Sequence, residues 1–360
     1  MNELYIGVMS GTSLDGIDIV LCDISSSKCD LVSSFESPFD EQLKDEILSV
    51  IMDRTTLEQI GIVDNKLGNL FADAINTFIK KEQIDTSKIT AIGLHGQTLW
   101  HKPNGKNPFS MQLGDANIVA AKTNIQVVAD FRRMDMAHGG QGAPLAPAFH
   151  QFVFSKLEKN VAILNIGGMA NLTILGKSLS GWDIGAGNVL MDYWIKQSQN
   201  KAYDKGGEFA KQGNIDKNLL TSFLDDAYFK KIPPKSTGRE YFNSSWLAEH
   251  LPILQTIKDK DIQRTLLELT AQSIANDIKK TATNLLIVCG GGAKNNFLMS
   301  RLKELCNIEV TKSDKYGISG DFMEAIAFAW LAYKRVHREK VNLSSVTGAR
   351  KDSILGGIYG

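Results

Sequence analysis

The stretch G-V-M-S-G-T-S-L-D-G-I-D (residues 7–18) joins two apolar, β-rich segments, 4–9 and 17–24, through a turn of glycine, serine and threonine. This pattern predicts a strand, a tight turn and a second strand. Such a turn exposes backbone N–H groups with no large side chain in front of them, which is what a bound phosphate needs. A plain hairpin turn explains the same letters equally well. The two commonest nucleotide fingerprints, G-x-x-x-x-G-K-[ST] and G-x-G-x-x-G, are absent.

A similar pattern begins again in the second half of the chain, where an apolar run at 161–166 enters G-G-M-A-N and a further apolar run follows at 172–175. A β-meander that is opened by a glycine turn and continued by α/β crossovers therefore occurs twice. The repeat predicts two α/β domains with mixed sheets and a cleft between them. Apolar spacing predicts the other strands at 28–37, 89–94, 126–129, 284–288 and 309–311, and helices at 41–52, 57–80, 116–122, 189–197, 262–280, 296–305 and 322–336.

The restart of the pattern predicts an N-terminal domain over residues 1–130 and a C-terminal domain over 131–337. We expect residues 338–360 to return to the first domain. Residues 204–244 have an irregular, mixed-charge composition that predicts a loop-rich insertion in the second domain.

Composition excludes several classes of protein. A chain of 360 residues that is 43% hydrophobic with 8 prolines is typical of a folded protein with two cores. Its 40 basic and 40 acidic residues cancel, which argues against a nucleic-acid or anionic-membrane partner. The four cysteines form no C-x-x-C pair, and no apolar run is long enough for a membrane span. We expect a soluble, cytoplasmic protein.

The stretch G-W-D-I-G-A-G-N (residues 181–188) contains the main catalytic candidate, Asp183. A carboxylate in a partly desolvated site is a natural general base, because loss of solvent raises its proton affinity. Gly187 and Asn188 precede a predicted helix whose N-terminus could face an anion. The alternative is that Asp183 is a turn or capping acid.

Two further glycine turns are candidates for ligand contacts. Gly167 and Gly168, in L-N-I-G-G-M-A-N-L-T, occupy the place in the second half that the first turn occupies in the first half. Gly290 to Gly292 follow an apolar strand in V-C-G-G-G-A-K-N-N, where bare backbone would accept a flat ligand such as adenosine. An ordinary strand-to-helix connection explains one glycine better than three, and the neighbouring Cys289 is expected to belong to the core.

Polar residues also follow apolar strands in H-G-Q-T-L-W-H (95–101) and A-D-F-R-R-M-D (129–135), where ligand-facing loops of α/β sheets lie. The six histidines show no zinc-binding spacing, so no zinc site is predicted. Glu324 has the local pattern of a capping-box partner to Asp321 at the start of the last helix.

Together these stretches resemble the anhydro-N-acetylmuramic acid kinase family, bacterial sugar kinases of the actin, hexokinase and heat-shock-chaperone ATPase superfamily. The resemblance also includes G-G-Q-G-A-P-L and G-D-F-M-E-A-I-A-F-A-W-L-A and extends nearly end to end. One departure is Ala186, where the family pattern has proline. The resemblance implies a two-domain actin-like ATPase fold, a duplicated ribonuclease H-like arrangement of mixed sheets flanked by helices, with the active site in an interdomain cleft.

The resemblance implies a phosphotransferase with an alcohol group as acceptor. It would use ATP and Mg²⁺ to open the 1,6-anhydro ring of anhydro-N-acetylmuramic acid and phosphorylate it, giving N-acetylmuramic acid 6-phosphate for cell-wall recycling. Asp183 would take a proton from water that attacks the anomeric carbon, so that O6 accepts the γ-phosphoryl group. Asp15 is the metal candidate, directly or through water, with Asp18 beside it. A homodimer is a family expectation.

The resemblance also implies binding residues. The nucleotide would contact Gly11, Thr12, Ser13, Leu14, Asp15, Gly16, Ile17, Asp18, Gly167, Gly168, Gly185, Gly290, Gly291 and Gly292. The sugar would contact Glu324, with His95, Gln97, Arg132 and Asp135 as further candidates; Arg132 suits the lactyl carboxylate. Two alternatives remain open: a kinase for another amino sugar or a hexose, and a non-catalytic, nucleotide-switched chaperone or filament protein on the same fold.

Overall fold

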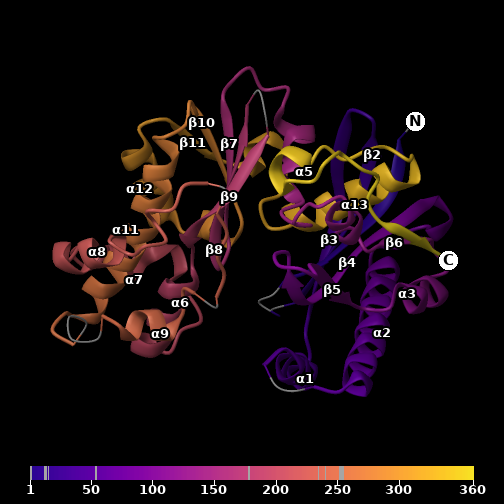
Figure 1. The fold of residues 1–360 in the computed structure, drawn as a ribbon, viewed down its shortest axis with the longest axis horizontal. Helices are drawn as coiled ribbons and strands as arrows, with labels where there is room; N and C mark the ends of the chain where they lie inside the picture. Colours follow the sequence, from indigo (N-terminus) through magenta and orange to yellow (C-terminus); the bar gives the residue numbers. More distant parts are fainter. Residues whose placement is uncertain are drawn as a thin grey trace. The chain divides into compact units, whose positions relative to one another are not determined.

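The computed structural model describes residues 2–11, 14, 16–52, 55–176, 179–233, 235–239, 241–250 and 255–360. Thr12, Ser13 and Asp15 of the predicted phosphate loop therefore lie outside the described residues. The chain divides into two compact units, Met1–Val153 with Phe322–Gly360, and Phe154–Asp321. Figure 1 shows both ribbons, with the C-terminal segment in yellow among the elements of the first unit.

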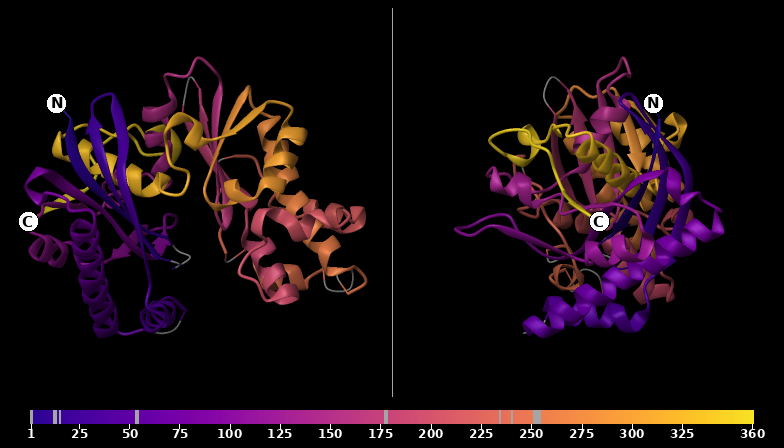
Figure 2. Two further views of the ribbon diagram at one scale, coloured as in Figure 1. Left: turned by 180° about the vertical axis from the view of Figure 1, so that it is seen from behind. Right: turned by 90° about the vertical axis from the view of Figure 1, so that its right-hand side faces the viewer.

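The first unit is built on a seven-stranded mixed sheet with the order β12-β6-β4-β1-β2-β3, in which β5 pairs with β4. An antiparallel meander opens it, and β4 and β6 then add parallel to β1 and to each other. The short strand β12 lies antiparallel to β6 (Figure 2). The strands are β1 (Glu3–Ser10), β2 (Gly16–Ser25), β3 (Lys28–Pro38), β4 (Ile89–Lys102), β5 (Phe109–Leu113), β6 (Val127–Ala129) and β12 (Gly357–Tyr359).

Helix α2 (Leu57–Lys81) supplies much of the apolar cover of this sheet. Its N-terminus is closed by a capping box between Thr56 and Gln59. Leu67, Phe71 and Phe78 recur at helical spacing on its buried face. The other helical segments of the unit are α1 (Glu41–Met52), η1 (Thr86–Lys88), α3 (Ala116–Thr123), α4 (Arg133–Ala137), α5 (Ala146–Phe154), α13 (Met323–Val336) and α14 (Ser344–Thr347).

Two paired glycines allow α13 to pack closely on the sheet. Gly7 of β1 is in register with Gly93 of β4. A Cβ on Gly7 would lie 2.0 Å from the carbonyl oxygen of Ala325, and one on Gly93 would lie 2.1 Å from that of Phe328. The helix backbone therefore occupies the space that side chains would fill, and α13 packs closely on β1 and β4.

The second unit has a five-stranded sheet with the order β11-β10-β7-β8-β9. Strands β7, β8 and β9 form an antiparallel meander, and β10 and β11 add in parallel. The strands are β7 (Val161–Ile166), β8 (Met169–Leu175), β9 (Ser180–Ala186), β10 (Leu285–Cys289) and β11 (Glu309–Lys312). Its helical segments outside the insertion are α6 (Val189–Gln199), α11 (Asp259–Ile278), α12 (Asn296–Cys306), η3 (Gly291–Lys294) and η4 (Ser313–Tyr316).

The two sheets share one connectivity. The order β3-β2-β1-β4-β6 in the first unit corresponds strand for strand to β9-β8-β7-β10-β11 in the second. This is a duplicated ribonuclease H-like arrangement, and it confirms the fold class predicted from the sequence. Within the described ranges, no helix has the length and apolar character needed to cross a membrane.

The segment 204–244 contains more helix than its composition suggests. It forms η2 (Lys205–Gly207), α7 (Glu208–Lys211) and α8 (Lys217–Leu224), and α9 (Ser244–Ala248) begins at its end. Between α8 and α9 the chain is irregular, and its aromatic residues pack on one another. Tyr228, Phe229 and Phe242 make ring contacts with centroids 5.5–6.2 Å apart. This aromatic cluster fixes the irregular segment in place.

Candidate active site

In the first unit, polar candidates gather at the end of β1 and in the middle of β4, because β4 continues to Lys102 where the sequence predicts a loop after residue 94. Ser10 and Gln97 are in register on these strands, and the Ser10 hydroxyl donates to Gln97 Oε1 at 2.5 Å. Both side chains are buried. His95 lies two residues before Gln97 and is also buried, with its ring 4.6 Å from that of Phe328 on α13.

Arg132, which follows β6, binds the middle of β4. Its Nη2 donates to His95 Nε2 at 2.8 Å and its Nε does so at 3.3 Å, while Nη1 donates to the Gly142 carbonyl at 2.8 Å. Because the guanidinium can only donate, His95 Nε2 accepts and the ring proton lies on Nδ1. Burial lowers the pKa of His95 well below its ordinary value, and the Arg132 charge lowers it further. His95 is therefore neutral.

Glu324 faces this cluster from the first turn of α13. The structure does not show the capping box considered for it, because the N-cap residue is Phe322 and no side chain caps the helix. Burial raises the pKa of Glu324, and the charge of Arg132 opposes that rise. Burial in turn lowers the pKa of Arg132 to about 10, opposed by Glu324. The arrangement is a half-buried carboxylate and a half-buried guanidinium, which suits a polar ligand.

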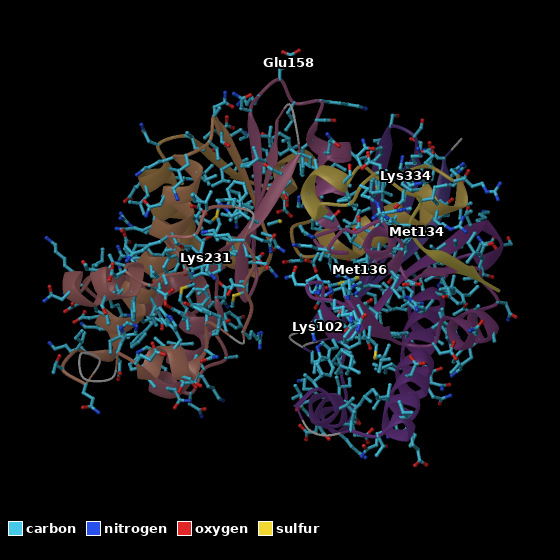
Figure 3. The ribbon with its side chains drawn as sticks, in the orientation of Figure 1. Lys102, Met134, Met136, Glu158, Lys231 and Lys334 are labelled. Carbon is cyan, nitrogen blue, oxygen red and sulfur yellow. The ribbon has the colours of Figure 1, made fainter. Side chains whose placement is uncertain are left out.

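Asp135 is engaged by the protein itself. Its Oδ2 accepts from the Gly142 N–H at 2.7 Å and its Oδ1 from the Thr347 hydroxyl at 2.8 Å. The residue is 3% exposed. On the same helix Met136, labelled in Figure 3, is buried and a Cβ on Gly142 would lie 2.8 Å from its Cγ. Asp135 thus shapes the turn whose Gly142 carbonyl holds Arg132.

In the second unit, Asp183 lies in the middle of β9, paired with Asn171 of β8. It is neither a turn residue nor a helix cap. Strand β9 is the last in its sheet, and residues of the insertion bind its outer edge. The Asp183 N–H donates to the Lys235 carbonyl at 3.0 Å, its carbonyl accepts from the Tyr228 hydroxyl at 2.8 Å, and its Oδ2 accepts from the Thr237 N–H at 3.1 Å.

The glycine turn between β7 and β8 is joined to the start of α6. The Gly187 N–H donates to the Gly168 carbonyl and the Asn188 N–H to the Gly167 carbonyl, both at 2.8 Å. A Cβ on Gly187 would lie 2.4 Å from the Gly167 oxygen. On the other side, a Cβ on Gly168 would lie 3.5 Å from Nη2 of Arg239, so a guanidinium stands beside this turn.

The glycines after β10 have different roles. A Cβ on Gly290 would lie 2.2 Å from Asn165 Oδ1, and one on Gly292 would lie 2.3 Å from Ile166 Cγ2. A Cβ on Gly291 would come no nearer than 3.9 Å to an atom of the described residues, the Nδ2 of Asn188. Close packing on β7 therefore explains two of the glycines, while Gly291 presents open backbone.

The described part of the first glycine turn is conformationally unusual. The Leu14 N–H donates to the Gly11 carbonyl at 3.2 Å, and Leu14 is buried with φ of 56°. A bulky residue in the left-handed region costs energy and is typical of functional turns. Gly16, Ile17 and Asp18 follow as the first residues of β2, with Asp18 opposite Met9 of β1.

Lys235, Thr237 and Tyr228 are not among the site residues that the sequence predicts. They come from the insertion, and the only local signal was the polar run K-S-T-G-R following two prolines. Their role becomes visible only when the insertion covers the edge of β9.

The two units with one strand order define a duplicated ribonuclease H-like protein of the actin-like class. The family model described as anhydro-N-acetylmuramic acid kinase matches residues 3–360. The chain therefore belongs to this family and is a phosphotransferase, as the resemblance implied.

Named relatives match over nearly their whole length. The chain is 57% identical to the anhydro-N-acetylmuramic acid kinase of Sulfurimonas denitrificans, with 100% of both chains covered. It is 55% identical to that of Sulfurovum sp. and 48% identical to one from Actinobacillus pleuropneumoniae, each with 99% of both chains covered.

Proposed function

We propose that the protein uses ATP to open the 1,6-anhydro ring of 1,6-anhydro-N-acetylmuramic acid and to phosphorylate O6, giving N-acetylmuramic acid 6-phosphate and ADP. The observation that carries this proposal is the carboxylate of Asp183 on β9, which the Thr237 N–H orients. The chain that contains it matches the kinase family over residues 3–360. The product class places the reaction in the recycling of cell-wall amino sugars.

Asp183 acts as the general base in this proposal. Its carboxylate takes a proton from a water molecule whose oxygen bonds to the anomeric carbon. The bond between that carbon and O6 breaks, and O6 accepts the γ-phosphoryl group as ADP leaves. The Thr237 N–H on Oδ2, together with the two backbone bonds to Lys235 and Tyr228, limits the orientations of the carboxylate. Positioned proton transfer of this kind contributes roughly 10²- to 10⁴-fold.

The sugar is assigned to the polar cluster of the first unit. Glu324 is positioned to accept from sugar hydroxyls, and Arg132 suits the lactyl carboxylate because a guanidinium pairs with carboxylates in a planar geometry. Three hydrogen bonds from Arg132 to His95 and Gly142 fix the plane of its guanidinium. Gln97 and His95 would complete the polar surface, while Asp135 supports it through Gly142.

The nucleotide is assigned to the glycine turns. Residues 11–18 and the turn at Gly167–Gly168 would face the phosphates, with the Gly167 N–H itself used inside the turn by the Met169 carbonyl. The open backbone of Gly291 would accept adenosine. Arg239 beside Gly168 would add positive charge. Phosphoryl transfer depends on neutralising the phosphate charges more than on covalent catalysis by the protein.

Magnesium would supply further neutralisation of the phosphates. A kinase usually holds Mg²⁺ through one or two carboxylates together with the phosphates of the nucleotide. Asp15 is the proposed ligand, directly or through water, and Asp18 at the start of β2 is the second candidate. We also propose a cytoplasmic homodimer, which light scattering of the purified protein would test.

The experiment is mass spectrometry of products after incubation with Mg-ATP, the anhydro sugar and ¹⁸O-water. The expected product carries one phosphate and one ¹⁸O at the anomeric carbon. A phosphorylated product with an intact anhydro ring would contradict the proposal and favour a simple sugar kinase. Nucleotide binding without any product, for this sugar and for other amino sugars, would favour the nucleotide-switched binding protein.

A further inference from the structure

A buried ion pair lies behind β9. Lys235 Nζ is 3.4 Å from Asp277 Oδ2, and the two side chains are 3% and 5% exposed. The Trp182 indole N–H donates to the same oxygen at 2.8 Å, and Lys280 binds the other oxygen at 2.8 Å. Burying such a pair costs several kcal/mol of desolvation per ion, so stability alone is a weak reason for it.

The same lysine is tied to the backbone of Asp183. The Lys235 carbonyl accepts from the Asp183 N–H, and two residues later the Thr237 N–H donates to the Asp183 carboxylate. The Lys235 ammonium also lies 5.0 Å from the ring centroid of Tyr228, whose hydroxyl donates to the Asp183 carbonyl. The residues that form the buried ion pair and the hydrogen bonds to Asp183 therefore belong to one short segment, 235–237.

We infer that Lys235 is a positioning residue for the reaction: its buried ammonium anchors residues 235–237 against β9, where this segment orients the carboxylate of Asp183. The inference rests on the proposed function, because it takes Asp183 to be the base. It assigns the insertion, residues 204–244, the task of orienting that base.

The charges around the two residues agree with this assignment. Burial lowers the pKa of Lys235, and the charges of Asp277 and Asp183 oppose that decrease. Other described charged or titratable groups also face this region. Lys230, Lys279 and Lys280 line the same pocket as Lys235 and Asp277, Lys231 lies over the Tyr228 ring, and Arg239 stands beside Gly168. Lys235 is the cation whose own backbone and near neighbour bind Asp183.

The test compares Lys235→Met with Lys235→Arg and with Lys230→Met. Lys230 is a matched control, since it belongs to the same segment but is exposed and paired with Asp225 at the surface. We expect Lys235→Met to lower kcat about tenfold or more and to leave the Kd for ATP within about twofold. Loss of the neighbouring cation should also move the acid limb of the kcat profile to higher pH, by about one unit. Lys235→Arg should restore the limb, and Lys230→Met should match the wild type.

Folded Lys235→Met protein with a wild-type kcat and an unmoved acid limb would overturn the inference. So would a loss of thermal stability alone, with unchanged kcat per folded molecule. If Lys235→Met does not fold, Asp277→Asn provides the second test. Because Asp277 raises the pKa of Lys235, its removal should move the alkaline limb of kcat to lower pH, and an unmoved limb would overturn the inference.

The Asp183→Asn variant separates this inference from the function on which it rests. Normal turnover of Asp183→Asn would remove the proposed base and the inference with it. Loss of turnover in Asp183→Asn together with a normal Lys235→Met enzyme would leave the base in place and overturn only the role of Lys235.

Discussion

Asp183 shows how one residue can be fixed by a segment that is distant in the chain. Both its backbone N–H and its carbonyl would be open on the outer edge of β9 without the insertion. Lys235 and Tyr228 bind those groups, and Thr237 binds the carboxylate. A carboxylate held in this way loses little orientation entropy when the reaction begins, which is what a positioned base needs.

The first prediction concerns this carboxylate. Asp183→Asn keeps the size of the side chain and an oxygen that can accept from Thr237, but it removes the basic group. We expect turnover to fall by at least about two orders of magnitude, with the ATP dissociation constant nearly unchanged. Steady-state kinetics and calorimetric titration with ATP would check both quantities, and near-normal turnover would exclude Asp183 as the base.

The second prediction concerns Glu324. Replacing Glu324 with glutamine keeps the shape of the side chain and removes the negative charge that interacts with the Arg132 guanidinium. Because a hydrogen bond to a charged group contributes about 1.5–3 kcal/mol, we expect KM for the sugar to rise at least about tenfold. The KM for ATP should stay within about twofold. An unchanged KM for the sugar would remove Glu324 from the sugar site.

At the scale of elements, the position of α13 depends on Gly7 and Gly93. The carbonyls of Ala325 and Phe328 occupy the space over these glycines, so the helix lies unusually near the strands. Glu324 precedes Ala325 directly. The spacing between helix and sheet therefore sets how near Glu324 lies to Arg132 and His95.

The third prediction follows from this contact. Gly7→Ala places a Cβ 2.0 Å from a backbone oxygen that can move only with the helix. We expect the free energy of unfolding to fall by about 1–3 kcal/mol and KM for the sugar to rise. The control is Gly61→Ala on α2, where a Cβ meets no described atom within 4 Å. That change should add about 0.5–1 kcal/mol in urea unfolding. A Gly7→Ala protein with wild-type stability and KM would contradict the argument.

Much of the fold and the choice of Asp183 could be predicted from local patterns, because the meanders, the glycine turns and the long helices depend on nearby residues. The sequence predicts Asp183 as the base, but the small residues around it predict turns where the strand β9 forms. The packing of Gly7 and Gly93 under α13 could not be predicted, because the helix begins 316 residues after Gly7. The role of Lys235 could not be predicted either, because its sequence neighbours indicate an ordinary polar residue and only the fold places Asp277 beside it.

At the scale of the whole molecule, each unit has its own apolar core. One core gathers residues of β1, β2, α2 and β4, and the other gathers residues of β7, β9, α11 and β10. The first unit also contains two buried histidines, His95 and His150. Burial lowers the pKa of both, to about 3 for His150. The stability of the first unit is therefore coupled to pH.

The fourth prediction is a loss of stability in acid. Below an unfolded-state pKa of about 6.5 the unfolded chain binds more protons than the folded one, so the contribution of each histidine is complete above pH 6.5 and falls as pH decreases. The slope is up to about 1.4 kcal/mol per pH unit for each group. For His150 it continues toward pH 3. Between pH 7 and pH 5, the free energy of unfolding of the first unit should therefore fall by about 2 kcal/mol less in His150→Leu than in the wild type.

Hydrogen exchange of peptides from β1 and β4 measures the opening free energy of the first unit at each pH, apart from that of the second. His138→Leu is the control, since His138 lies at the end of α4 and is only half-buried. Carboxylates that titrate in the same range are common to all three proteins, so they cancel in the comparison. If His150→Leu loses as much stability as the wild type between pH 7 and pH 5, protonation of His150 does not limit the acid stability of this unit.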